Sequence, residues 1–232
     1  MKLLFFGDVM FGRNNNHFIE NPFIYIKKYL SKADTIIFNL ETVISPIPIN
    51  DTYKTDKVFN YQSNGNQLQK LKQMTKLNKQ LIASTANNHS LDYGEYGLKK
   101  TKAFLRQNNI LFANKKYLEK EEIIFLSYSD HCGCNNISQW AKHINILDYA
   151  NVEGLFTLIR SLKNKNKKII FSIHWGSNWL DSIPNTMVEL GKKLIDNGVD
   201  IVFGHSAHHI PPVPYEIYKN KIIIYGLGDL IN

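Results

Sequence analysis

The sequence predicts an α/β protein in which mainly parallel strands alternate with helices and a few antiparallel strands lie at the edges. Short apolar runs alternate along the chain with longer segments whose apolar residues recur at helical spacing. Polar clusters follow six of these runs, as expected where parallel strands end at one edge of a sheet. The 232 residues, 44% of them hydrophobic, can bury a sizeable core. Because no linker or internal repeat divides them, we expect residues 1–232 to form one domain.

Apolar and β-branched runs give the expected strands in order. They lie at residues 3–6, 35–38, 81–85, 110–113, 123–128, 169–173, 200–203, 213–218 and 222–225. The segment Lys219-Asn220-Lys221 separates the last two runs and indicates a hairpin, so we expect an antiparallel pair at that edge.

Segments with apolar residues three and four positions apart give the expected helices. They lie at residues 22–30, 66–79, 94–108, 152–162 and 185–197. Pro22 stands at the start of the first, where the missing N–H costs nothing, and Gly198 follows the last as a C-cap.

Two long polar stretches, residues 42–65 and 129–148, separate these elements. Loops of this length are usually functional, so we expect them to determine substrate identity. Four aromatic residues belong to these stretches or to the loop after the strand at 169–173, namely Tyr53, Tyr61, Trp140 and Trp179. Each either lines a pocket or packs the edge of the fold, and packing is the commoner fate.

The six polar clusters contain the side chains that carry chemistry. They are Gly7-Asp8-Val9-Met10, Asn39-Leu40-Glu41, Asn87-Asn88-His89-Ser90-Leu91-Asp92-Tyr93-Gly94, His174-Trp175-Gly176, Gly204-His205-Ser206-Ala207-His208-His209 and Gly226-Leu227-Gly228-Asp229. Carboxylate, amide and imidazole groups converging from strand ends are what a metal site on a hydrolase needs.

Each cluster alone also has an ordinary structural interpretation. Asp8 could cap a helix, Asn88 could shape a turn, and His174 could be a hydrogen-bonded core residue. Glu41 is harder to explain this way, because burying an unpaired carboxylate is costly. The strongest single signal is the pair His205 and His208, which a glycine turn can present on one side. Together, the clusters favour a metal or catalytic centre.

The clusters also resemble those of a known family, the poly-γ-glutamate capsule biosynthesis (CapA) family, a branch of the calcineurin-like metallophosphoesterase superfamily. The matching stretches occur in family order over nearly the whole chain: Gly7 to Arg13, Asn39-Leu40-Glu41, Ala86 to Gly94, His174-Trp175-Gly176, Gly204-His205-x-x-His208 and Tyr225 to Asp229.

The resemblance implies a metallophosphatase-like β-sandwich flanked by helices (αββα), with a metal centre on loops at one edge. It implies ligands for one or two divalent ions: Asp8 and His208 for a first ion, Glu41 as the bridging carboxylate, and Asn88, His174 and His205 for a second. This donor set suits Mn, Fe or Zn.

Three departures from the superfamily pattern affect these expectations. Met10 stands where metallophosphoesterases proper have a histidine, so the first metal site has fewer strong ligands. The histidine cluster leaves His209 as a competitor of His208 for the metal. The chain ends at Asn232, where relatives normally continue, so we expect the domain to lack a C-terminal segment.

The resemblance implies a metal-dependent hydrolase that cleaves a phosphoester or a γ-glutamyl or peptide amide during synthesis of poly-γ-glutamate or another envelope polymer. His89 is then the general acid, and Asp92 orients it. Two alternatives stay open. One is a non-hydrolytic accessory protein of a polymer synthase. The other is a metal-independent peptide epimerase, whose acid-base pair comes from Asp8, His89, His205 and His208.

Composition limits the partners and the location. The net charge of +8 comes mostly from lysines, which we assign chiefly to solvated surfaces, although it would also attract an anionic polymer, peptide or phosphoester. Few arginines and no basic-aromatic interleaving disfavour nucleic acid. No apolar run reaches the ~20 residues of a membrane span, and no signal peptide is visible. We therefore expect a cytoplasmic protein, or an envelope-associated one if a leader was removed.

The two cysteines, Cys132 and Cys134, flank one glycine. Neighbours this close rarely form an unstrained disulfide, so we expect two free thiols in a reduced compartment rather than a metal or redox pair. The sequence gives no indication of oligomeric state.

Overall fold

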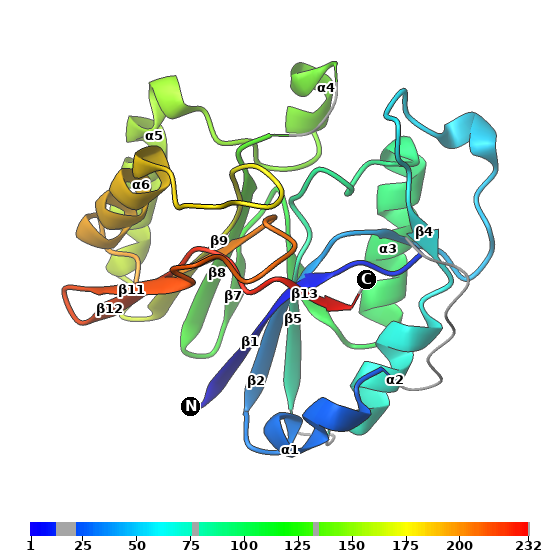
Figure 1. Cartoon of the computed structure of the whole chain (residues 1–232), viewed down its shortest axis with the longest axis horizontal. Coiled ribbons are helices and arrows are strands. Elements are labelled where there is room, and N and C mark those ends of the chain that lie inside the picture. Colours follow the sequence, from blue (N-terminus) through cyan, green and yellow to red (C-terminus); the bar gives the residue numbers. More distant parts are fainter. Residues whose placement is uncertain (13–21, 76–78, 132–134, 232) are drawn as a thin grey trace.

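The computed structural model describes residues 1–12, 22–75, 79–131 and 135–231. It confirms the α/β class, with two sheets packed face to face and helices on both outer faces (Figure 1). Cys132 and Cys134, and Arg13 at the end of the first stretch that resembles the family, lie outside the described residues.

The first sheet contains five parallel strands. Their spatial order is β13 (Asp229–Ile231), β1 (Leu3–Val9), β2 (Thr35–Leu40), β5 (Gln80–Ser84) and β6 (Leu111–Ala113).

The second sheet contains six strands, parallel in the centre and antiparallel at both edges, as the sequence predicts. Their order is β11 (Tyr215–Tyr218), β12 (Lys221–Ile224), β10 (Ile201–His205), β9 (Lys168–His174), β8 (Ile123–Ser129) and β7 (Leu118–Lys120). The antiparallel pair β11–β12 is the predicted hairpin.

Apolar side chains from both sheets fill the space between them. They include Ile37 and Ile82 from the first sheet and Phe125, Ile170 and Phe203 from the second. Because interior positions alternate along each strand, this layer fixes which residues of every strand face inward.

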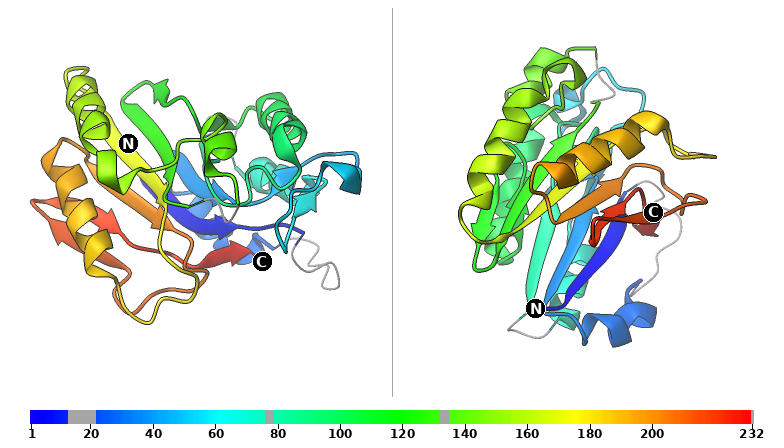
Figure 2. Two further views of the ribbon diagram at one scale, coloured as in Figure 1. Left: turned by 90° about the horizontal axis from the view of Figure 1, so that it is seen from above. Right: turned by 90° about the vertical axis from the view of Figure 1, so that its left-hand side faces the viewer.

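The helices cover the outer faces of the two sheets, so that the sheets lie between two helical groups (Figure 2). The first sheet is covered by α1 (Lys27–Leu30), α2 (Asn66–Met74) and α3 (Gly94–Gln107), and the second by α5 (Glu153–Lys163) and α6 (Asn185–Asp196). No helix among the described residues is long and apolar enough to span a bilayer.

Several predicted boundaries are wrong by a few residues. The helix predicted at 66–79 ends at Met74, because Thr75 adopts an extended conformation. The segment predicted as a helix at 22–30 is a 3-10 turn, Ile24–Ile26, followed by the single turn of α1. The strands β7 and β13 were not predicted, since three residues are too few to show a period of two.

The two long loops also contain short elements that the sequence does not predict. Residues 42–65 include the parallel pair β3 (Val43–Ile44) and β4 (Gln62–Ser63) and a 3-10 turn, Asp51–Tyr53. Residues 129–148 include α4 (Ile137–Ala141), and a 3-10 turn, Tyr149–Asn151, follows them.

Strand register brings the polar clusters to one edge of the sandwich. In the first sheet Asp8 pairs with Asn39 on one side and with Asp229 on the other. In the second sheet His174 pairs with His205. The carboxyl-terminal ends of β1, β2, β9 and β10 and the start of β13 thus bring side chains together that are far apart in sequence.

Gly7 allows the close approach that places Asp8. A Cβ atom at Gly7 would lie 1.8 Å from the backbone oxygen of Gly228, and the Asp8 N–H donates to that same oxygen at 2.9 Å. Only a residue without a side chain fits between β1 and the segment before β13.

We therefore expect Gly7→Ala to lower the free energy of unfolding by about 3 kcal/mol, because a backbone atom cannot yield as a side chain would. Gly154→Ala is the matched control, since a Cβ there meets nothing within 4 Å. It should be neutral or stabilise by up to about 1 kcal/mol. Urea unfolding followed by circular dichroism measures both. Equal stabilities of the two variants would contradict this explanation of Gly7.

Candidate metal centre

Two buried carboxylates form the base of the cluster. Asp8 is the penultimate residue of β1, and Glu41 directly follows β2. The Asn39 side-chain amide donates to both, to Asp8 Oδ1 at 2.7 Å and to Glu41 Oε2 at 3.1 Å. The Ser206 N–H donates to Asp8 Oδ2 at 3.1 Å. One amide therefore fixes the two carboxylates relative to each other.

Three imidazoles face these carboxylates. His174 Nε2 and His208 Nε2 lie 3.7 and 3.8 Å from Glu41 Oε1. His205 Nδ1 and His208 Nδ1 lie 3.8 and 3.7 Å from the two oxygens of Asp8. His174 Nδ1 and His205 Nδ1 are 3.0 Å apart.

The structure thus brings together most of the side chains that the sequence selects as metal ligands. Two groups have ligand atoms within 4.8 Å of one another, Asp8 with His174 and His205, and Asp8 with Glu41 and His208. Asp8 belongs to both groups, whereas the resemblance assigns the bridging position to Glu41. Glu41 Oε1 nevertheless lies within 4 Å of a histidine from each group.

Burial shifts the protonation equilibria of these groups in opposite directions. Desolvation raises the pKa of Asp8 to about 6, against the hydrogen bond from Asn39. Desolvation and the charges of Asp8 and Asp229 raise the pKa of Glu41 well above its ordinary value. Desolvation lowers the pKa values of His174 and His205 well below theirs. A bound divalent cation would reverse the shifts of the carboxylates and keep the imidazoles neutral, since it favours ionised carboxylates and neutral imidazoles.

Three buried polar atoms at the site have no hydrogen-bond partner among the described residues. They are Glu41 Oε1, Asn88 Oδ1 and His174 Nε2. Buried polar atoms are almost always paired, so each of these needs an explanation. All three belong to predicted ligands and can offer a lone pair, and the donor set suits a divalent cation. The residues present therefore fit a metal ion.

The structure distinguishes the two competing histidines. His208 Nδ1 lies 2.9 Å from Asp229 Oδ1, which leaves Nε2 directed toward Glu41. Both ring nitrogens of His209 lie 2.9 Å from backbone oxygens, those of Ala207 and Leu180. His208 therefore has a nitrogen facing the cluster, whereas His209 is engaged with the backbone.

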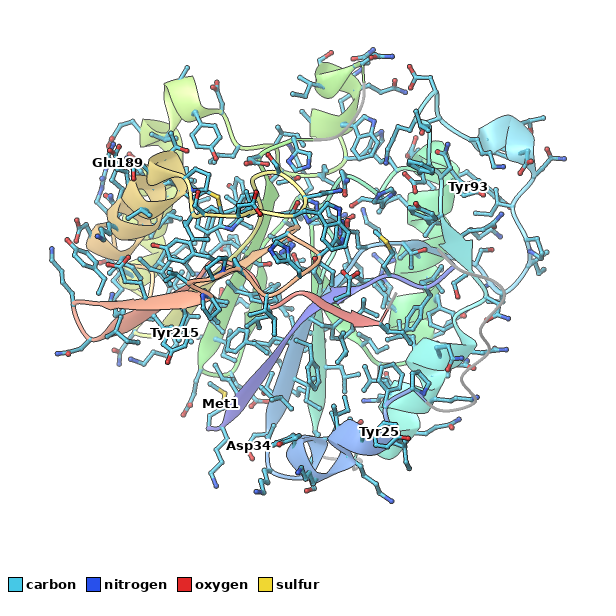
Figure 3. The ribbon with its side chains drawn as sticks, in the orientation of Figure 1. Met1, Tyr25, Asp34, Tyr93, Glu189 and Tyr215 are labelled. Carbon is cyan, nitrogen blue, oxygen red and sulfur yellow. The ribbon has the colours of Figure 1, made fainter. Side chains whose placement is uncertain are left out.

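The predicted proton-transfer pair lies in the loop between β5 and α3, which ends at Tyr93 (Figure 3). His89 Nδ1 lies 2.7 Å from Asp92 Oδ2. Burial lowers the pKa of His89, while the hydrogen bond and charge of Asp92 oppose that shift. The geometry therefore suits Asp92 as the residue that orients His89.

Lys57 completes this group and was not predicted. Its side chain keeps only 6% of its exposure, and Nζ lies 2.6 Å from Asp92 Oδ1. It also donates to the backbone oxygen of Asn88. The Tyr61 N–H donates to Asp92 Oδ2 at 2.7 Å. One carboxylate thus holds the loop 42–65 against His89.

The two long loops meet beside the cluster. Asn135 Nδ2 donates to Asp56 Oδ2 at 2.7 Å, and Lys57 Nζ lies 5.4 Å from the centre of the Trp140 ring. At the start of the second loop, Asp130 accepts from the Gly176 N–H at 2.9 Å, and the His131 ring lies 5.3 Å from that of His174.

The four aromatic residues divide into two kinds. The Tyr61 ring lies 4.7 Å from the His89 ring, and Trp179, which is 55% exposed, lies 6.0 Å from His208. Tyr53 instead stacks on Tyr96, and Trp140 is buried against α3 and the loop before it. The first two adjoin site histidines, and the other two pack the fold.

Three residues at the site lacked an assigned role in the sequence analysis: Asn39, Lys57 and Asp229. Asn39 and Asp229 belong to the polar clusters, so their positions near Glu41 and Gly228 in the sequence could have identified them as site residues. Lys57 gave none, because it lies in a long loop of a lysine-rich chain.

Comparison with known proteins identifies relatives of this chain. The profile of the family described as bacterial capsule synthesis protein PGA_cap matches residues 2–232. The chain is 28% identical over 247 residues to the PGA biosynthesis protein CapA of Bacillus subtilis, covering 98% of this chain and 62% of the relative. It is 32% identical over 174 residues to a Mycobacterium tuberculosis protein named "Probable polyglutamine synthesis accessory protein", covering 65% of this chain and 45% of the relative. The chain therefore spans less than two thirds of the length of either relative.

A solved structure shares the fold. A hypothetical protein from Thermus thermophilus matches 99% of this chain and 77% of its own, with a TM-score of 0.55 and 13% sequence identity. At that identity the likeness shows the fold alone.

The contacts of Lys57 predict a large effect of its removal. Lys57→Met leaves the buried Asp92 carboxylate without its cation, so the free energy of unfolding should fall by about 3 kcal/mol. Hydrogen exchange of the Tyr61 backbone amide should accelerate, because its acceptor, Asp92 Oδ2, is no longer held in place by Lys57. Lys54→Met is the control, since Lys54 pairs with the exposed Asp51 and its loss should change neither quantity. A Lys57→Met protein as stable as wild type would contradict the assigned role.

Proposed function

Because the chain belongs to the family of bacterial capsule synthesis proteins, we propose that it is a metal-dependent hydrolase. Its substrate is a phosphoester or a γ-glutamyl or peptide amide, in the synthesis of poly-γ-glutamate or another anionic envelope polymer. One observation carries the proposal. Glu41, Asn88 and His174 each bury a polar side-chain atom without a hydrogen-bond partner among the described residues.

The proposed ligands of one or two divalent ions, Mn, Fe or Zn, are Asp8, Glu41, Asn88, His174, His205 and His208. Such an ion supplies Lewis-acid polarisation of a phosphoryl or acyl oxygen and lowers the pKa of a coordinated water. The hydrogen bonds from Asn39 support this assignment, because they hold the two carboxylates in fixed positions. The Asp229 contact does the same for His208.

His89 serves as the general acid in this proposal. Asp92 accepts from Nδ1 and so orients the ring, leaving Nε2 to carry the transferred proton. Lys57 balances the charge of Asp92. The same carboxylate therefore contacts both the lysine and the imidazole that it orients.

A second candidate is a non-hydrolytic accessory protein that binds the growing polymer. It is favoured by the name of the Mycobacterium tuberculosis relative, which describes an accessory protein. The net charge of +8 is compatible with a polyanionic partner.

Metal content tests the ligand assignment. Protein purified without chelator should contain Mn, Fe or Zn at about one or two ions per chain, as a closely spaced donor set would hold. Asp8→Ala and His205→Ala should lose that metal. His143→Ala, which alters a histidine outside the cluster, should retain it. A wild-type protein that stays metal-free after Mn or Zn is supplied would exclude the hydrolase mechanism.

Activity assays separate the alternatives. If His89 is the general acid, His89→Ala should lower kcat by about 100- to 10,000-fold for phosphoesters or γ-glutamyl amides. Metal content should not change, and a chelator should abolish turnover. Racemisation of a peptide that survives the chelator but fails in His89→Ala would instead indicate an epimerase. Salt-sensitive binding of polyglutamate without turnover would favour the accessory role.

A further inference from the structure

An exposed tryptophan stands beside the metal centre, in the loop that joins β9 to α6. Trp179 is 55% exposed, whereas the other two tryptophans of the chain, Trp140 and Trp175, are buried. The Trp179 ring lies 6.0 Å from the ring of His208, a proposed metal ligand. A single exposed aromatic residue is common on protein surfaces, so a role for Trp179 needs further observations.

The backbone of Trp179 supplies one such observation. Its φ angle is +58°, in the left-handed region, where the Cβ atom of an L-residue crowds the following carbonyl oxygen. Ser206 and His208, in the loop after β10, also have positive φ, and the other described non-glycine examples lie near helix ends or in hairpin turns. Bulky residues rarely adopt this conformation, and strain of this kind is concentrated at functional sites.

Neighbouring groups hold Trp179 in the strained conformation. Its N–H donates to the Ala207 backbone oxygen at 2.9 Å. Its ring stacks on the His209 ring, with centroids 5.8 Å apart and planes 26° apart. His209 is itself fixed, because both of its ring nitrogens lie 2.9 Å from backbone oxygens, those of Ala207 and Leu180. The indole is therefore held in place in the free protein, which lowers the entropy cost of binding a ligand to it.

The fold gives no reason for a tryptophan at this position. Among the described residues, Trp179 is not part of the core cluster that contains its neighbours Trp175 and Leu180. A glycine would adopt the same φ without strain. Exposure of the ring and strain of the backbone both disfavour the folded state, so the side chain is better explained by a ligand than by packing.

The chemistry of an indole ring indicates the kind of ligand. Its faces pack against flat or apolar groups, and its N–H can donate a hydrogen bond. A compact phosphoester presents a charged tetrahedral group to the metal and has little else to place against the ring. A chain of γ-glutamyl or peptide amides repeats planar amide groups and methylenes, and it extends past the bond that lies at the metal centre.

We propose that Trp179 is a substrate-binding residue that stacks on an amide-linked chain beside the metal centre, so that the substrate is a γ-glutamyl or peptide amide rather than a compact phosphoester. The identity of the substrate rests on the function proposed above, whereas binding at Trp179 requires neither metal nor turnover. Contacts of this kind, away from the reacting bond, position a substrate for reaction.

Tryptophan fluorescence measures this binding directly, because the other two tryptophans are buried. The protein is titrated with a γ-linked glutamate oligomer and separately with glycerol phosphate, each with and without Mn²⁺. The oligomer should protect Trp179 from quenching by acrylamide in a saturable manner. Glycerol phosphate at the same concentrations should give no protection.

Variants separate a binding role from a structural one. Trp179→Ala should weaken oligomer binding by about 10-fold in calorimetric titration, as the loss of an aromatic anchor does. Trp179→Gly should bind as weakly, yet its thermal midpoint should be at least that of wild type, because glycine relieves the strain. Tyr25→Ala is the control, since Tyr25 is 85% exposed and lies next to α1, away from the metal centre (Figure 3). It should bind the oligomer like wild type.

A Trp179→Ala protein that binds the oligomer as tightly as wild type would overturn the proposal. So would a Trp179→Gly protein that unfolds at a lower temperature than wild type, because the ring would then serve the fold. Protection by glycerol phosphate, or by phosphatidylglycerol vesicles in place of the oligomer, would overturn the assigned ligand. Oligomer binding at Trp179 in a protein that holds no metal would refute the hydrolase proposal alone, and this inference would stand.

Discussion

The organisation of this protein depends on the burial of two carboxylates, Asp8 and Glu41, at the end of a β-sandwich. The hydrogen bonds described above reach them from neutral donors, an amide and a backbone N–H. The buried lysine nearby pairs with Asp92 instead. Desolvation of such groups is costly unless a cation or a proton compensates. The neighbouring imidazoles, with their lowered pKa values, supply lone pairs rather than positive charge.

The sandwich makes this burial possible because it aligns strand ends from two sheets. Parallel pairing sets Asp8 beside Asn39, and His174 beside His205, without help from the loops. The close contact of Gly7 with the Gly228 backbone sets the position of β1. Ser172 Oγ lies 2.9 Å from His205 Nε2 and 2.8 Å from Ser84 Oγ, so the polar network extends down into the inter-sheet core. The two sheets therefore position the metal-centre residues, and the loops 42–65 and 129–148 lie beside them.

The loops contribute contacts at the site that the sequence analysis did not predict. Lys57 reaches from residues 42–65 to Asp92, and Asp56 bonds Asn135 across to the second loop. Trp179 and Tyr61 adjoin site histidines from separate segments. Such contacts form between segments distant in sequence, so composition and local spacing carry no record of them.

The sequence by itself determined the α/β class, the order of the long elements and the polar clusters that converge, because periodicity and strand-end chemistry are local properties. It missed β7, β13 and the β3–β4 pair, whose two or three residues show no period. Only the tertiary structure decided that His208 rather than His209 faces the carboxylates, that Lys57 joins His89 and Asp92, and that Ser172 contacts His205. Each of these three contacts joins atoms from elements that are distant in sequence. The packing of those elements, rather than any local sequence pattern, brings the atoms close together.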